Sequence, residues 1–182
     1  MTTRSAAEVI DFWFVQHGKE HWFGGGPAFD AKIAAEFGTT HDEVSRGEAW
    51  TWRRTPEGRL AEIVVLDQFS RQLYRGEVRA FAQDRMALAL AQEAVNGGHA
   101  AALPPERRMF MLLPFMHSES LVIHDEAVRL FTELGIQETL DFEMAHQACL
   151  HRFGRYPRRN AALGRASTPE ELEYIASDAD RW

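Results

Sequence analysis

The stretch LAEIVVLDQFSRQLYR, residues Leu60–Arg75, joins an apolar run to a charged segment. At 3.6 residues per turn, Asp67 and Arg71 fall on the same helical face as Leu60. A charge on a core-facing stripe costs several kcal/mol unless it is paired. Asp67 and Arg71 are spaced i, i+4 in the order that favours an ion pair. The stretch therefore predicts a core helix with a paired carboxylate, which either ties helices together or belongs to a binding site.

Helix signals recur along the chain, whereas the alternation typical of strands is absent. Ser5–Glu8 and Thr168–Glu171 each match a capping box, in which a hydroxyl and a glutamate cap the first helical turn. Gly135 and Gly154 follow periodic segments, as glycines do where a helix ends in a left-handed residue. We expect Pro114 to break a helix, because proline lacks an N–H and clashes one turn back. The predicted helices are Ser5–Gln16, Pro27–Ser45, Pro56–Tyr74, Ala80–Asn96, Pro105–Leu113, Glu119–Leu134, Gln137–Phe153 and Pro169–Ser177.

The composition suits a single domain over residues 1–182, since the chain is 45% hydrophobic. About eight short helices with brief connections predict an all-α fold, either a bundle or a solenoid-like array. The formal net charge of −7 argues against nucleic-acid binding. The single cysteine, Cys149, excludes an intramolecular disulfide and is compatible with a reducing compartment. The first residues do not resemble a signal peptide, and the most hydrophobic window, Met109–Ile123, is too short to span a bilayer. We therefore expect a cytoplasmic protein without membrane contact.

Further polar residues interrupt apolar helical faces. Asp84 and His146 each lie on a face with aromatic neighbours, and the segment His117–Glu119 follows the expected break at Pro114. Such residues must be paired, hydrated or functional. The structural interpretation makes Asp84 a bridge to a neighbouring helix and His146 a hydrogen-bonded core histidine. For His117–Glu119 both interpretations stay open, because side chains at a helix break can point into a cleft.

Positive charge concentrates near the C-terminal end. Between Met144 and Pro169 there is no acidic residue, although the chain is acidic in total. The arginines of this segment are Arg152, Arg155, Arg158, Arg159 and Arg165. Guanidinium groups suit carboxylates and phosphates, so a small anionic ligand is one expectation. The alternative is that these arginines neutralise helix C-termini and pair with Asp67, Asp84 or Glu119.

Motifs for cofactors and metals are absent from the sequence. Phe23–Pro27 is glycine-rich but lacks the lysine and hydroxyl of a phosphate-binding loop. His117, Glu119 and His124 do not match the spacings of zinc sites. We therefore expect no metal and no cofactor.

Four segments together resemble the bacterial domain of unknown function 924 family. They are Phe12–Phe14, Leu66–Gly76, His117–Glu119 and Arg152–Glu171, and the resemblance spans nearly the whole chain. It implies an α–α superhelix similar to tetratricopeptide-repeat proteins, and it implies no activity. The matching positions are Asp67, Gln68, Arg71, Tyr74, Arg75, Asp84, His117, Ser118, Glu119, His146, Arg152, Gly154, Arg155, Arg159 and Asn160.

Three hypotheses of function follow. The first is a binding module whose concave face receives a protein or a peptide. The second is a small-anion pocket or an enzyme, with His117, Glu119 and Asp67 as the catalytic candidates. Its ligand-binding candidates are Arg71, His146, Arg152, Arg155, Arg159 and Asn160. The third hypothesis makes all these residues a buried network that fixes helix packing, in which Asp67 and Arg71 anchor a polar seam with Arg155 and His117–Glu119.

Overall fold

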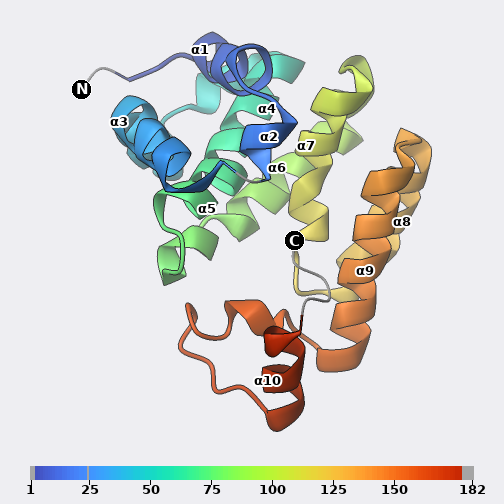
Figure 1. Ribbon diagram of the computed structural model, residues 1–182. Helices are drawn as coiled ribbons and strands as arrows, with labels where there is room; N and C mark the ends of the chain where they lie inside the picture. Colours follow the sequence, from blue (N-terminus) through green and yellow to red (C-terminus); the bar gives the residue numbers. More distant parts are fainter. Residues whose placement is uncertain (1–2, 24, 178–182) are drawn as a thin grey trace.

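The computed structural model describes residues 3–23 and 25–177, and these residues form helices and turns without a β-strand (Figure 1). The α-helices are α1 (Ala6–Asp11), α2 (Lys19–Trp22), α3 (Gly26–Ser45), α4 (Pro56–Val64), α5 (Ser70–Leu73), α6 (Asp84–Asn96), α7 (Pro105–Met116), α8 (Leu121–Leu134), α9 (Gln137–Phe153) and α10 (Pro169–Ala176). The π-helical turns are η1 (Phe12–Gln16) and η3 (Val65–Phe69), and the 3-10 turns are η2 (Trp50–Arg54), η4 (Val78–Phe81), η5 (Ala100–Ala102) and η6 (Pro157–Arg159).

The all-α prediction is confirmed. The tetratricopeptide-like superhelix stays a prediction. So does the single domain over residues 1–182, a range that includes positions outside the described residues. None of the helices that the described residues form combines the length and hydrophobicity needed to cross a membrane.

The helix ends follow the local sequence signals. The Ser5 side chain accepts a hydrogen bond from the Glu8 N–H, and the Thr168 side chain does the same for Glu171, so both predicted capping boxes form. Gly135 and Gly154 follow α8 and α9 with φ of 77° and 70°. This left-handed conformation favours glycine and ends each helix.

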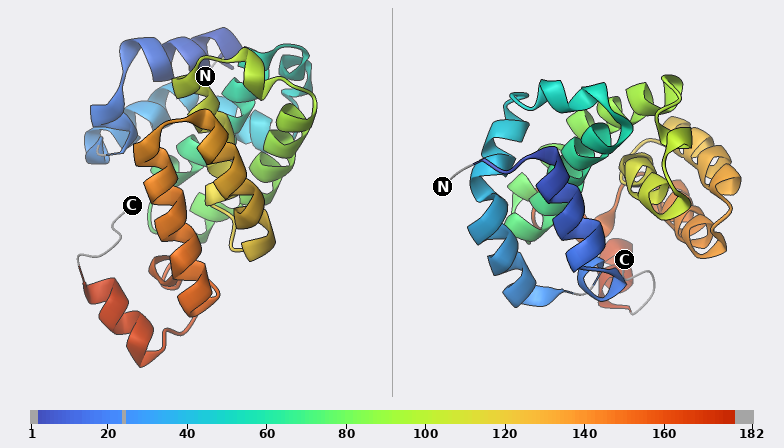
Figure 2. Two further views of the ribbon diagram at one scale, coloured as in Figure 1. Left: turned by 90° about the vertical axis from the view of Figure 1, so that its right-hand side faces the viewer. Right: turned by 90° about the horizontal axis from the view of Figure 1, so that it is seen from above.

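The helix α4, which carries the first part of the quoted stretch, lies at the centre of the molecule. It packs against α1, α6 and α7. The helices α7, α8 and α9 lie side by side, and each runs antiparallel to the one before it (Figures 1 and 2). After η6 the chain forms α10, which lies below α9 in Figure 1.

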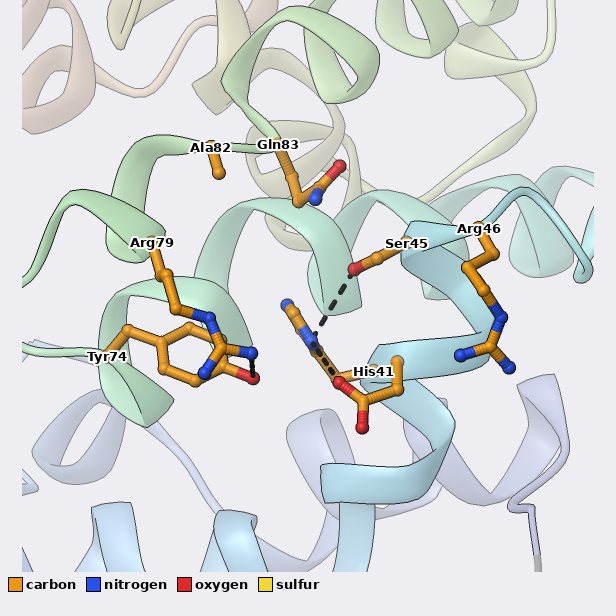
Figure 3. Close-up of a pocket in the computed structure, with 8 residues that line it drawn as sticks. His41, Ser45, Arg46, Tyr74, Arg79, Ala82 and Gln83 are labelled. Carbon is orange, nitrogen blue, oxygen red and sulfur yellow. Dashed lines mark hydrogen bonds and ion pairs between the residues drawn. The ribbon is translucent and has the colours of Figure 1, made fainter.

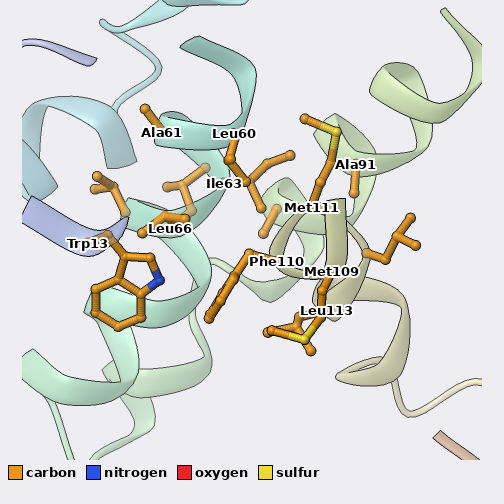
Figure 4. Packing of buried hydrophobic residues seen from close by; sticks show 14 of the residues in the cluster. Trp13, Leu60, Ala61, Ile63, Leu66, Ala91, Met109, Phe110, Met111 and Leu113 are labelled. Carbon is orange, nitrogen blue, oxygen red and sulfur yellow. The ribbon is translucent and has the colours of Figure 1, made fainter. Parts of the chain in front are cut away.

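The main hydrophobic core joins the N-terminal helices to α7. Trp13 and Leu66 have no exposed surface, and Phe110 on α7 is 1% exposed (Figure 4). The rings of Trp13 and Phe110 meet edge to face, with their centroids 5.7 Å apart. A smaller apolar cluster beside α10 contains Cys149, whose thiol is buried as expected.

The expected helix break at Pro114 is wrong. The helix α7 continues through Pro114 to Met116, and the turn follows at His117. A proline inside a helix loses its own N–H bond to the carbonyl one turn back, and its ring crowds that carbonyl. Every residue from Met109 to Met116 is buried, and this apolar packing outweighs the lost bond.

A buried polar pair joins α8 to α9. His124 and Glu143 have no exposed side-chain surface, and His124 Nδ1 lies 2.5 Å from Glu143 Oε1. His124 Nε2 lies 2.8 Å from the carbonyl oxygen of Ser118, which only accepts, so Nε2 carries a proton. Burial raises the pKa of Glu143, and its Oε2 has no hydrogen-bond partner among the described residues. From the burial and this short contact we predict that Glu143 is protonated and donates to Nδ1 of His124.

We expect Glu143→Gln to keep the free energy of unfolding within about 1 kcal/mol of the wild type, because an amide N–H also donates to His124 Nδ1. Glu143→Leu should cost roughly 1–3 kcal/mol, because it leaves that nitrogen buried without a donor. Chemical denaturation at pH 7 measures both. Because the pKa of Glu143 is raised in the native state, its contribution to the free energy of unfolding is complete below the unfolded pKa of about 4.3. This contribution is lost as the pH rises through the native pKa. A Gln variant much less stable than the wild type at pH 7 would contradict the protonated pair.

Candidate functional site

The predicted helix over Pro56–Tyr74 forms as α4, the π-helical turn η3 and α5 in direct succession. A π turn holds an extra residue and is frequent at functional sites. Arg71 Nη1 still donates to the main-chain oxygen of Asp67 at 2.8 Å and lies 3.1 Å from Asp67 Oδ1. The ion pair that the spacing predicts is therefore present, although the turn that carries it is irregular.

The Asp67 carboxylate is buried and receives several hydrogen bonds. Its exposure is 1%. His117 Nδ1 lies 2.7 Å from Asp67 Oδ1, and Gln68 Nε2 donates to Oδ2 at 2.6 Å. Burial alone would raise the pKa of Asp67, but the Arg71 guanidinium and His117 outweigh burial and hold this pKa below its ordinary value. Asp67 is therefore charged at neutral pH, so that it accepts and His117 Nδ1–H donates.

His117, which follows the last residue of α7, presents its other ring nitrogen as an acceptor. Since Nδ1 carries the proton, Nε2 of the neutral ring has a lone pair, and no described residue donates a hydrogen bond to it. The side chain is 15% exposed. Burial and the nearby Arg71 lower the pKa of His117, and Asp67 opposes them only in part. The imidazole is therefore neutral at pH 7 and held in one tautomer.

Two arginines share the carboxylate of Asp84. Arg71 donates to both oxygens of Asp84, at 3.0 and 3.1 Å, and Arg159 donates to Oδ2 at 3.2 Å. Arg159 also donates to the main-chain oxygen of His117 at 2.9 Å. Burial and the neighbouring Arg71 guanidinium lower the pKa of Arg159. We call Asp67, Arg71, Asp84, His117 and Arg159 the Asp67 cluster.

Two other candidates lie beside this cluster. His146 donates from Nδ1 to the main-chain oxygen of Phe142 at 2.7 Å, and burial lowers the pKa of His146 to about 3. Its ring lies edge to face with Tyr156, whose ring also faces Arg159. Glu119 accepts two hydrogen bonds from Arg165, at 2.7 and 2.9 Å, and one from the Tyr156 N–H. Burial would raise the pKa of Glu119, but these donors lower it.

The remaining candidates hold α10 rather than join the Asp67 cluster. Arg155 donates to both oxygens of Glu171, at 2.6 and 2.8 Å, and Asn160 donates to the same carboxylate at 3.3 Å. Arg152 pairs with Glu170 on the surface. The expectation that Arg155 belongs to the same seam as Asp67 is therefore wrong. Of the arginines that we predicted to bind an anion, Arg71 and Arg159 meet at one place.

Sequence reasoning missed Tyr156 and Glu143. Tyr156 links the C-terminal loop to α7, because its hydroxyl donates to the Met116 carbonyl at 2.7 Å. Glu143 precedes His146 by three residues and therefore shares its helical face, which was an available signal. Within the described residues, no group of three or more His, Cys, Asp or Glu side chains is placed to hold a metal ion.

Comparison with known proteins gives a family and a fold. The family model described as bacterial protein of unknown function (DUF924) matches residues 9–179. A solved structure of a protein of unknown function from Agrobacterium tumefaciens is similar, with 36% sequence identity and a TM-score of 0.89 over 94% of this chain and 96% of that chain. A search of curated proteins returned no match. Because the family match covers nearly the whole chain, the protein belongs to the DUF924 family of bacterial proteins.

Proposed function

We propose that the Asp67 cluster binds a small ligand that carries a carboxylate or phosphate group beside a hydrogen-bond donor. One observation carries the proposal: the Arg159 guanidinium, which has spare N–H groups, lies next to His117, whose Nε2 has a free lone pair. Both side chains are partly exposed, His117 at 15% and Arg159 at 14%. The place thus offers both a cationic donor and a neutral acceptor.

The anionic part of the ligand binds Arg159. A guanidinium has five N–H donors, and the hydrogen bonds among the described residues engage Nη1 with Asp84 and Nη2 with the His117 carbonyl. Arg159 shares Asp84 with Arg71, and the two cations repel each other. An added carboxylate or phosphate relieves this repulsion and takes charge-assisted hydrogen bonds.

The donor part of the ligand binds His117. A ligand hydroxyl or amine donates to Nε2, while Asp67 keeps the ring in the tautomer that accepts. If a reaction follows, His117 is the proton acceptor and Asp67 stabilises the imidazolium that forms. Glu119 serves as a positioning residue in this proposal, because Arg165 and the Tyr156 N–H occupy its oxygens.

A second candidate function is peptide binding, and exposed aromatic rings favour it. Lys19 of α2 pairs with Glu138 of α9 at 3.4 Å. Phe23 lies four residues after Lys19, and Phe142 lies four residues after Glu138. The two aromatic residues are 66% and 45% exposed. Phe23 stacks on the buried Phe110. Two exposed rings on neighbouring elements suit an apolar side chain of a partner peptide.

We expect at least one compound from a panel of small carboxylates and phosphate esters to raise the melting temperature of the wild type at millimolar concentration. Arg159→Gln should weaken that ligand at least about tenfold, because the charged donor is lost. The matched control is Arg152→Gln, which alters an exposed arginine paired with Glu170. Equal ligand affinity in wild type and Arg159→Gln, measured by calorimetry, would refute the assignment to this cluster.

We expect Asp67→Ala to lower the free energy of unfolding by about 3–5 kcal/mol, because Arg71, Gln68 and His117 lose a buried partner. Urea denaturation measures this, and Glu126→Ala, which removes an exposed partner of Arg129, should cost less than about 1 kcal/mol. The lowered pKa of Asp67 means that its stabilisation is complete above the unfolded pKa of about 3.9 and is lost as the pH falls through the native pKa. A loss below about 0.5 kcal/mol at pH 7 would contradict a buried ion pair.

For the peptide-binding candidate, we expect a partner that co-purifies with the wild type to be lost from Phe142→Asp. The reason is that a carboxylate on this surface opposes burial of an apolar side chain. Leu172→Asp, on the exposed side of α10, is the control and should keep the partner. Co-purification followed by mass spectrometry reads out both variants. Equal recovery with Phe142→Asp would remove this surface from consideration.

A further inference from the structure

A hollow of about 330 Å³ opens between α3 and the segment that follows α5 (Figure 3). It shares no residue with the Asp67 cluster, although Gln83, which also lines it, directly precedes Asp84 in the chain. His41, Asp42 and Ser45 of α3 line it, together with Tyr74 and Arg79. Its volume lies at the lower end of the range of about 300–1,000 Å³ that is usual for small-molecule sites.

His41 is held so that one ring nitrogen faces the hollow as an acceptor. The side chain is 4% exposed, although histidine is polar. The Ser70 hydroxyl donates to the Leu66 carbonyl at 2.6 Å, so Ser70 can only accept from His41 Nε2, which lies 2.8 Å away. Nδ1 of the neutral ring therefore carries the lone pair. Burial lowers the pKa of His41, which keeps the ring neutral at pH 7.

Two oxygen atoms lie near this nitrogen. Ser45 Oγ lies 3.5 Å and Asp42 Oδ1 lies 3.9 Å from His41 Nδ1. No lysine or arginine among the described residues lies within 4 Å of the Asp42 carboxylate. A primary ammonium group has three N–H donors and one positive charge. It matches a ring nitrogen, a hydroxyl oxygen and an unpaired carboxylate.

A cation lies on the other side of His41. Figure 3 shows Arg79 against the ring of Tyr74, and its guanidinium lies 3.7 Å from the ring centroid. Arg79 Nη2 donates to the Tyr74 hydroxyl at 2.7 Å, and no carboxylate of the described residues lies within 4 Å of Arg79. The cation–π contact and the hydrogen bond fix the guanidinium in place without neutralising it.

We propose that this hollow binds a free α-amino acid. The ammonium group donates to His41 Nδ1, Asp42 and Ser45, and the carboxylate binds the Arg79 guanidinium. An unpaired acid and an unpaired base at one small hollow complement the two charges of a zwitterion. A ligand with only one of these charges would leave either Asp42 or Arg79 unpaired.

The test is calorimetric titration of the full chain with each proteinogenic L-amino acid. We expect at least one to bind with a millimolar or tighter Kd. Its N-acetyl derivative, which lacks the ammonium charge, and its carboxamide, which lacks the carboxylate, should each bind at least about tenfold more weakly. Absence of binding up to about 10 mM, or equal binding of the N-acetyl derivative, overturns the proposal.

Substitutions in the hollow test whether the amino acid binds there. Asp42→Asn and Arg79→Gln change exposed side chains and should each weaken binding at least about tenfold. The control Asp125→Asn makes the same chemical change on an exposed position of α8 and should bind like the wild type. Arg159→Gln should keep the binding at the hollow, because Arg159 does not line it. If Arg159→Gln abolishes binding and Asp42→Asn does not, the amino acid binds at the Asp67 cluster and the hollow is not its site.

Discussion

The hydrogen bond between the Asp67 carboxylate and His117 joins two helical segments that are separated by 50 residues. A carboxylate with 1% exposure is tolerated only because Arg71, His117 and Gln68 surround it with donors. The same bond sets the tautomer of His117 and therefore leaves a lone pair on Nε2. The buried charge of Asp67 thus orients Arg71 and His117 in the candidate site.

The C-terminal arginines extend this electrostatic framework to the rest of the chain. Arg159 reaches Asp84 at the start of α6, Arg165 reaches Glu119 between α7 and α8, and Arg155 reaches Glu171 of α10. The acid-free segment from Met144 to Pro169 therefore receives its negative partners from outside itself. This arrangement explains how an acidic protein accommodates a locally basic segment. Of these three arginines, Arg159 belongs to the Asp67 cluster.

One irregular turn connects the two places where we propose ligands. The π-helical turn η3 carries Asp67 and also Leu66, whose carbonyl accepts from Ser70. Ser70 in turn accepts from His41 and fixes its ring toward the hollow. Residues of this one turn thus contribute to holding both histidine rings, Asp67 directly and Leu66 through Ser70.

The sequence by itself determined the all-α class, the capping boxes at Ser5 and Thr168, the glycine ends of α8 and α9, and the Asp67–Arg71 pair. These features depend on contacts within about one helical turn, which spacing and residue type specify. The helix end at Pro114 was predicted wrongly, because burial of the last turn of α7 outweighs one lost hydrogen bond. Only the tertiary structure decided that His117 binds Asp67, that Arg159 and Arg155 go to different carboxylates, and that His41 faces a hollow. Each of these partners lies far away in the sequence, and several carboxylates of similar chemistry compete for each arginine. The packing of the helices, which no local pattern encodes, selects among them.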